Sequence, residues 1–218
     1  MDFWSFFRKL SKKHSWVSGM EGVRWRFELS PYDMEIGIDE KQDNFNILME
    51  DLRAIGEAKL ADELTVSYDK VRAELLQFYK ALPRCVFQGD ENFSNLCVDE
   101  ENHIIGLFDF NMSGSEVIAN YLANIAFQGN FYYTDEIVAK HSADEIFHMV
   151  MDSYKKSTEL IKEYYAFTAE EWRAYKLYSK IVMISGYVNQ AAFSYFLKKE
   201  NEKTKTIRLI QILSAIEF

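Results

Sequence analysis

The stretch Phe87-Gln-Gly-Asp-Glu-Asn-Phe-Ser-Asn95, followed by Ile104-Ile-Gly-Leu-Phe-Asp-Phe-Asn-Met-Ser-Gly114, decides the fold of this 218-residue chain. Short β-prone runs and polar turns here replace the helical patterns found elsewhere in the sequence. Two strand-like runs, at 95–99 and 103–109, are joined by the polar turn Asp99-Glu-Glu-Asn102. The sequence therefore predicts a small β-hairpin inside a helical protein.

Three polar residues stand at positions that this hairpin would bring together. Asn95 begins one arm and Asp109 ends the other, so antiparallel pairing places both at the same end. Asp90 precedes Asn95 by five positions, which is only a short loop. We therefore expect Asp90, Asn95 and Asp109 to converge at one end of the hairpin.

Such a set has a chemical meaning. Phosphoryl transfer from a nucleotide needs a carboxylate that accepts the substrate hydroxyl proton, together with an amide and a second carboxylate that hold Mg²⁺. The alternative is structural, because Asp90, Asn92 and Asn95 are also common turn formers and Asp109 can simply end a strand. That alternative leaves the joint spacing of these residues unexplained.

Composition limits the classes of protein to which the chain can belong. Hydrophobic residues make up 48% and charged residues 27%, as in a soluble globular protein whose core needs no disulfide or metal. The net charge of −9 argues against nucleic acid as a partner. It fits a small cationic substrate, and it equally fits a chain that uses acidic charge to stay soluble.

The two cysteines and the hydropathy pattern indicate a location. Cys85 and Cys97 have no metal-ligand spacing around them, so we expect reduced thiols in a cytoplasmic protein. We also expect no membrane partner, because the N-terminal residues lack the pattern of a secretory signal and no apolar run reaches the length of a membrane span.

Helical patterns flank the hairpin on both sides. Helices are predicted at about 2–14, 43–56, 67–81, 115–128, 142–165, 169–198 and 202–216, with a loop at 15–38 and a β-prone run at 84–88. Capping boxes are predicted at Ser113–Glu116, Ser142–Glu145 and Thr168–Glu171. Gly186, inside a helical pattern, predicts close helix packing. We expect one domain over 1–218 that is mainly α with a small β-hairpin, an α+β fold.

The first predicted helix is amphipathic. Its apolar side chains recur at helical spacing, and they are Phe3, Trp4, Phe7 and Leu10. Its basic side chains lie on other faces and in the last turn, and they are Arg8, Lys9, Lys12 and Lys13. Two interpretations stay open for the aromatic residues: ordinary core packing, or a patch used for self-association or a partner.

The stretch as a whole resembles the aminoglycoside phosphotransferase and choline kinase family, which shares the protein-kinase-like fold. Members carry a His-Gly-Asp-x₄-Asn loop, a hairpin ending in Ile-Asp-Phe, a glycine, and a helix containing Leu-Ala. The matching residues here are Gln88-Gly-Asp90 through Asn95, Phe108-Asp-Phe110, Gly114 and Leu122-Ala123. Residues 84–123 would then form the catalytic-loop and metal-site segment.

The resemblance implies an enzyme of the kinase class, with ATP and Mg²⁺ as cofactors and a hydroxyl of a small, by charge preferably cationic, molecule as acceptor. Asp90 would be the catalytic base, and Asn95 and Asp109 would be the magnesium ligands. Gln88 replaces the family's histidine and would orient the catalytic loop in a supporting role. The family's Asp-Pro and further aspartate after the glycine are not matched, since Val117-Ile118 and Tyr121 stand there.

The family's β-rich N-terminal lobe, with its phosphate-covering loop and strand lysine, is not recognisable before Asp90. We therefore expect a kinase-like C-terminal lobe that is incomplete as an enzyme alone, whether its N-lobe is lost, truncated or encoded as a separate partner. The alternative function is a non-catalytic interaction module that forms a homodimer. A helical scaffold unrelated to kinases is a third possibility, in which Asn95 and Asp109 do not converge.

A second place for a cationic substrate is the loop at 127–136. Its aromatic rings lie next to Asp135 and Glu136, a combination that attracts cations. The alternative is a packed loop between helices.

Overall fold

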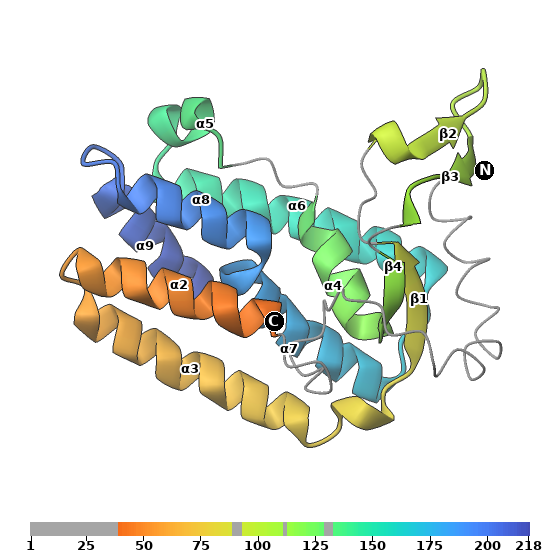
Figure 1. The fold of residues 1–218 in the computed structure, drawn as a ribbon, viewed down its shortest axis with the longest axis horizontal. Coiled ribbons are helices and arrows are strands. Elements are labelled where there is room, and N and C mark those ends of the chain that lie inside the picture. The colour runs from red at the N-terminus through yellow and green to blue at the C-terminus, as the bar shows by residue number, and fades with distance from the viewer. Residues whose placement is uncertain (1–38, 89–92, 111–112, 129–132) are drawn as a thin grey trace.

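The computed structural model describes residues 39–88, 93–110, 113–128 and 133–218 (Figure 1). The predicted helix at 2–14, the predicted loop at 15–38 and Asp90 lie outside these ranges. The described part is mainly helical with two small antiparallel sheets, which confirms the expected α+β class.

The helices form a body on one side of the molecule, and the strands lie together at its other side (Figure 1). Helix α4 packs against α7, α2 packs against α3 and α8, and α6 packs against α9. The bounds of the helices are α2 (Glu40–Ala54), α3 (Ala58–Leu76), α4 (Ile118–Gln128), α5 (Asp135–Lys140), α6 (Ala143–Tyr164), α7 (Ala169–Ser185), α8 (Tyr187–Leu197) and α9 (Lys203–Ser214). None of the helices in these ranges is long and apolar enough to cross a membrane.

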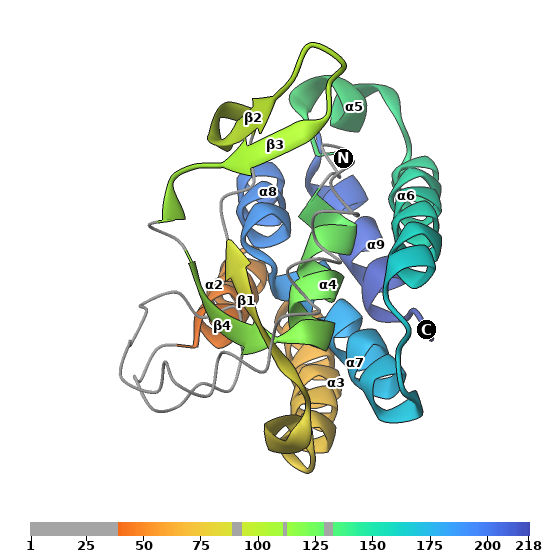
Figure 2. The same ribbon diagram turned by 90° about the vertical axis from the view of Figure 1, so that its right-hand side faces the viewer.

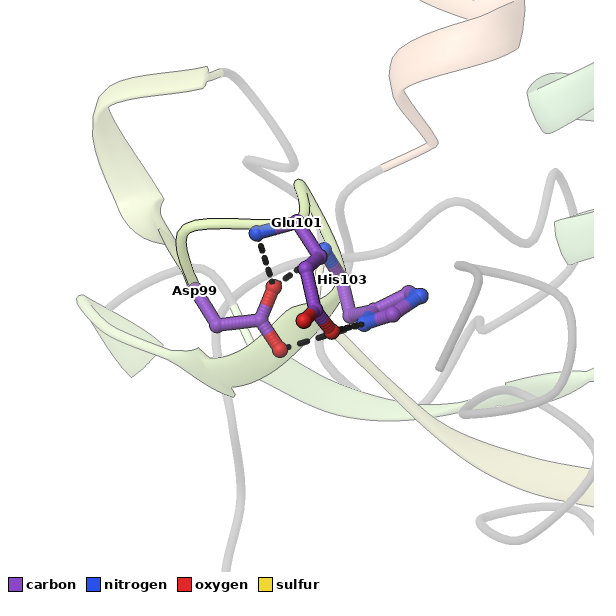
Figure 3. A group of neighbouring side chains, drawn as sticks. All are labelled: Asp99, Glu101 and His103. Atoms are coloured by element: carbon purple, nitrogen blue, oxygen red, sulfur yellow. Dashed lines mark hydrogen bonds and ion pairs between the residues drawn. The ribbon is translucent and has the colours of Figure 1, made fainter.

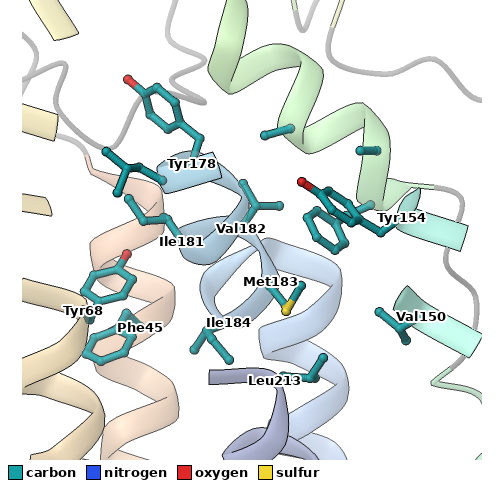
Figure 4. Packing of buried hydrophobic residues seen from close by; sticks show 14 of the residues in the cluster. Phe45, Tyr68, Val150, Tyr154, Tyr178, Ile181, Val182, Met183, Ile184 and Leu213 are labelled. Atoms are coloured by element: carbon teal, nitrogen blue, oxygen red, sulfur yellow. The ribbon is translucent and has the colours of Figure 1, made fainter. Parts of the chain in front are cut away.

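Helix α7 is the centre of the core. Its residues from Tyr178 to Ser185 are all buried except Lys180, so the helix is covered on nearly every side. Figure 4 shows Tyr178 to Ile184 of α7 between Phe45 of α2 and Tyr154 of α6. Each large apolar side chain buried in this way contributes roughly 1.5–3 kcal/mol, so the helical body is where the stability of the fold resides.

Two of the three predicted capping boxes are confirmed, at the starts of α6 and α7. The amide of Glu145 donates to Ser142 Oγ at 3.2 Å, and the amide of Ser142 donates back to the Glu145 carboxylate at 2.8 Å. The third is wrong, because Ser113 lies in strand β4 (Ser113–Val117) and helix α4 begins only at Ile118. The strand ladder there satisfies the backbone groups that a helix cap would have served.

The long helix predicted over 169–198 is also wrong, because Gly186 separates α7 from α8. A Cβ built on Gly186 would lie 2.6 Å from the carbonyl oxygen of Val182. The close contact predicted for this glycine therefore exists, but it is with the preceding turn of its own chain. Helix α5 was not predicted, and α3 begins at Ala58, nine residues before the predicted 67.

The predicted hairpin is confirmed as β2 (Leu96–Val98) paired with β3 (Ile104–Leu107). The second sheet pairs β1 (Arg84–Gln88) with β4, antiparallel, so that Gln88 stands opposite Ser113. Both sheets lie on the same side of the helical body, with the hairpin projecting from it (Figure 2). Neither Cys85 nor Cys97 forms a disulfide.

Candidate functional site

The hairpin register places Asn95 and Asp109 at the same end of the β2–β3 pair. Leu96 stands opposite Leu107, and the pairing extends one residue further because the amide of Phe108 donates to the Asn95 carbonyl at 2.8 Å. Asp109 follows directly. The two predicted metal ligands therefore lie just outside the paired ends of β2 and β3, next to the backbone hydrogen bond from Phe108 to Asn95.

The second sheet joins the segments 88–95 and 108–113 at their other ends. Gln88 pairs with Ser113, while Asn95 is bonded to Phe108. Segments 88–95 and 108–113 are therefore tied to each other at both ends. Asp90 lies outside the described residues. The described part of Gln88 is its backbone in β1.

The two predicted ligands differ in their surroundings. Asn95 is 8% exposed and its Oδ1 accepts a hydrogen bond from Ser94 Oγ at 3.4 Å, so its amide is fixed. Asp109 is exposed. Amide and carboxylate oxygens are the donors that Mg²⁺ prefers. The pair thus combines one buried amide and one exposed carboxylate.

The backbone of Asp109 is unusual. Its φ of 52° lies in the left-handed region, which costs a residue with a Cβ roughly 1–2 kcal/mol. The other described non-glycine residue with positive φ is Asn102, where the hairpin turn itself requires that conformation. Asp109 lies at the opposite end of the hairpin. Conformations of this kind concentrate at functional sites.

A row of buried polar residues follows the site, and it was missed from the sequence. Glu116, Asn120 and Asn124 recur every four residues and are 1%, 0% and 6% exposed. The Asn124 amide donates to the Asn120 carbonyl at 2.8 Å and to its Oδ1 at 3.0 Å. The signal was available for two of them, because Asn120 and Asn124 are polar residues at helical spacing inside the apolar run 117–127.

Lys41 is a further buried charge that the sequence did not single out. Its side chain is 2% exposed, and Nζ lies 3.8 Å from the Glu40 carboxylate. Burial lowers the pKa of Lys41, while the carboxylates of Glu40, Glu116 and Asp39 act in the opposite direction. The Glu116 carboxylate is close enough to act on the pKa of Lys41, so the start of α2 lies near strand β4.

The turn of the hairpin carries a separate group of possible ligand atoms, on Asp99, Glu101 and His103 (Figure 3). These atoms lie within 4.8 Å of one another, and His103 Nδ1 is 3.2 Å from Asp99 and 3.5 Å from Glu101. Asp99 Oδ1 also accepts from the amides of His103 and Glu101 at 2.8 and 3.0 Å. Bonds within the turn account for this arrangement, so it is weak evidence for a metal.

The loop predicted to attract a cationic substrate has its carboxylates already paired. The Asp135 carboxylate forms an ion pair with Lys199 and accepts a hydrogen bond from the Tyr195 hydroxyl at 3.0 Å. The Glu136 carboxylate forms an ion pair with Lys140 at 2.7 Å. The Lys199 ammonium also lies 4.1 Å from the centroid of the Tyr195 ring. A cationic substrate would have to displace these lysines.

Protein-family models, curated proteins and solved structures were compared with the chain, and no match was found. The open end of the hairpin carries two oxygen-bearing side chains, those of Asn95 and Asp109, beside the bond from Phe108 to Asn95, and Asp90 precedes Asn95 by five positions in the sequence.

Proposed function

We propose that this chain is a kinase-like C-terminal lobe that takes part in transferring the γ-phosphate of ATP to a hydroxyl of a small molecule. The observation that carries the proposal is that backbone hydrogen bonds join segments 88–95 and 108–113 at both ends. Paired strands at one end and the bond from Phe108 to Asn95 at the other hold together the two segments that contain the candidate residues.

Each residue has a role in this proposal. Asn95 and Asp109 hold Mg²⁺, which when bound neutralises charge on the nucleotide phosphates. Asp90 accepts the proton of the acceptor hydroxyl. Gln88 supports the loop that carries Asp90. Because catalysis of phosphoryl transfer is mostly positioning and charge stabilisation, fixed placement of these groups is what the protein has to supply.

The left-handed backbone of Asp109 supports the same assignment. The chain maintains a costly conformation at an exposed carboxylate directly after β3. Strain of this kind persists where the surrounding structure enforces it. Because nucleotide phosphates are held from both sides in phosphoryl transfer, the proposal includes a covering element, whether another part of the protein or a separate partner chain. Affinity for nucleotide without that cover is expected to be weak.

Titration calorimetry with Mg-ATP on the 218-residue chain tests the proposal. We expect binding at millimolar nucleotide that is lost in Asp109→Ala. The matched control is Asp62→Ala, which removes an exposed carboxylate on α3 that pairs with Arg53 at 2.9 Å. Equal binding by the wild type, Asp109→Ala and Asp62→Ala would contradict the assignment of Asp109 as a magnesium ligand. Absence of binding to the wild type would contradict it as well.

A further inference from the structure

The helical body contains a cavity of about 240 Å³ between α2, α3, α7 and α9. Figure 4 shows part of its apolar lining, with the stacked rings of Phe45 and Tyr68 across from Ile184 and Leu213. All four side chains are buried. Every described residue of the lining lies in these four helices or directly after α9, so the cavity is separate from the candidate site on the hairpin.

Several polar groups in the lining are already bonded within the protein. The Tyr68 hydroxyl donates to the Lys41 carbonyl at 3.0 Å, and the Ser214 hydroxyl donates to the Gln211 carbonyl at 2.8 Å. An ordered water needs about two to four polar partners. A lining of this kind therefore favours an apolar occupant over water.

Among the described residues of the lining, Lys180 of α7 is the one cation. Its side chain is 27% exposed, and Nζ forms an ion pair with the Glu217 carboxylate at 3.1 Å. Glu217 is 91% exposed and lies in irregular backbone after α9. An ion pair with one partner in solvent contributes little to stability. A carboxylate from outside can therefore replace Glu217 at low cost.

The volume and the ion pair together define a ligand. A cavity of 240 Å³ holds about eight groups the size of a water molecule, at roughly 30 Å³ each. The Glu217 carboxylate shows which group Lys180 accepts at this place. A ligand that matches both features has an apolar part of about eight atoms and a single carboxylate.

We propose that this cavity binds a small monocarboxylic acid with an apolar chain of about seven carbons. The chain lies among Phe45, Ile184 and Leu213, and the carboxylate takes the place of Glu217 as the partner of Lys180. Burial of the chain drives binding, and the charge fixes the orientation of the ligand. No part of this proposal depends on metal or nucleotide, so it stands or falls separately from the proposed function.

Titration calorimetry with octanoate on the 218-residue chain tests the proposal. For a ligand of this size we expect a dissociation constant in the millimolar range. Lys180→Met retains an apolar stem without the ammonium, and it is expected to weaken binding about tenfold. Glu217→Gln removes the competing carboxylate, and it is expected to tighten binding about twofold.

The matched control is Lys140→Met, which removes a lysine of α5 that pairs with Glu136 at 2.7 Å and lies outside the lining. It is expected to leave the affinity for octanoate unchanged, and thermal melting verifies that each variant is folded. Octylammonium has the same chain and the opposite charge, so it is expected to bind about tenfold more weakly than octanoate. Equal affinity of the wild type for the two compounds would contradict the role of Lys180.

Methyl NMR of the wild type locates the bound octanoate. We expect shifts of the methyl signals of Leu64, Ile184 and Leu213, which line the cavity. Shifts centred instead on the open hollow at Phe167 and Trp172 would overturn the proposal. Absence of binding to the wild type, or equal octanoate affinity in Lys180→Met and the control, would overturn it as well.

Discussion

The helical body and the hairpin differ in how they use polar groups. In the body, buried hydroxyls bond to one another: Tyr154 to Ser179 at 3.0 Å, and Thr158 to Tyr175 at 2.7 Å. Burial raises the pKa of Tyr68 to about 12, so its hydroxyl remains a donor to the Lys41 carbonyl. The hairpin instead carries exposed rings, an acidic turn and a left-handed aspartate. The core that stabilises the fold therefore lies in the helical body, while the candidate site lies on the hairpin.

Truncation of one ring in each region gives the largest expected contrast. Tyr175 is 0% exposed at the centre of the core, so Tyr175→Ala is expected to lower the free energy of unfolding by about 3–5 kcal/mol. Phe108 is 56% exposed, and Phe108→Ala is expected to cost about 1 kcal/mol or less. Urea unfolding measures both. Equal losses would show that the hairpin shares the stability of the body.

Two glycines give a second contrast. In Gly186→Ala the new methyl group meets the Val182 carbonyl at 2.6 Å, and a loss of about 1–3 kcal/mol in unfolding free energy is expected. In Gly106→Ala, on β3, it meets the Cys97 Cβ at an ordinary 3.5 Å, and a change within about 0.5 kcal/mol is expected. If both variants melt at the same temperature, the break between α7 and α8 is not set by this contact.

Two serines distinguish a helix cap from a strand residue with the same sequence signature. Ser142→Ala removes one half of the capping box of α6 and is expected to cost about 1 kcal/mol. Ser113→Ala changes a residue of strand β4 and is expected to cost about 0.5 kcal/mol or less. Thermal unfolding of both variants measures the difference. A larger loss for Ser113 would contradict the strand assignment.

The smallest effect concerns the hairpin turn and pH. The amide of His103 donates to Asp99 and, as the largest cause, lowers the pKa of that carboxyl. A folded pKa below the unfolded one means that the turn is fully stabilised at neutral pH. That stabilisation is lost as the pH falls through the lowered pKa. Carbon-detected NMR titration should give an Asp99 midpoint below that of an ordinary aspartate. A midpoint at or above the ordinary value would contradict the hydrogen bonds in Figure 3.

Local signals explain what the sequence predicted. The hairpin follows from alternating residues around a polar turn, and the caps of α6 and α7 follow from residues three positions apart. These interactions are complete within a few residues, so a short window contains their cause. The positions of Asn95 and Asp109 at one end of the hairpin follow from the same register.

Non-local pairing explains what the sequence did not predict. Strand β4 exists because Val117 pairs with Arg84, 33 positions earlier, and no local pattern in its Ser-Gly-Ser run indicates that partner. Burial of Glu116 depends on elements that meet only in the fold. The left-handed conformation of Asp109 is not revealed by its neighbours in the sequence.

The central claim is that the open end of the hairpin, and not its turn, binds a metal–nucleotide complex. Addition of Mn²⁺ with ATP to the isotope-labelled chain tests it directly, because the paramagnetic ion broadens the NMR signals of nearby amides. The account predicts selective broadening at Asn95 and Asp109, which is lost in Asp109→Asn. Broadening centred on Glu101 and His103, or none at either end, would contradict it.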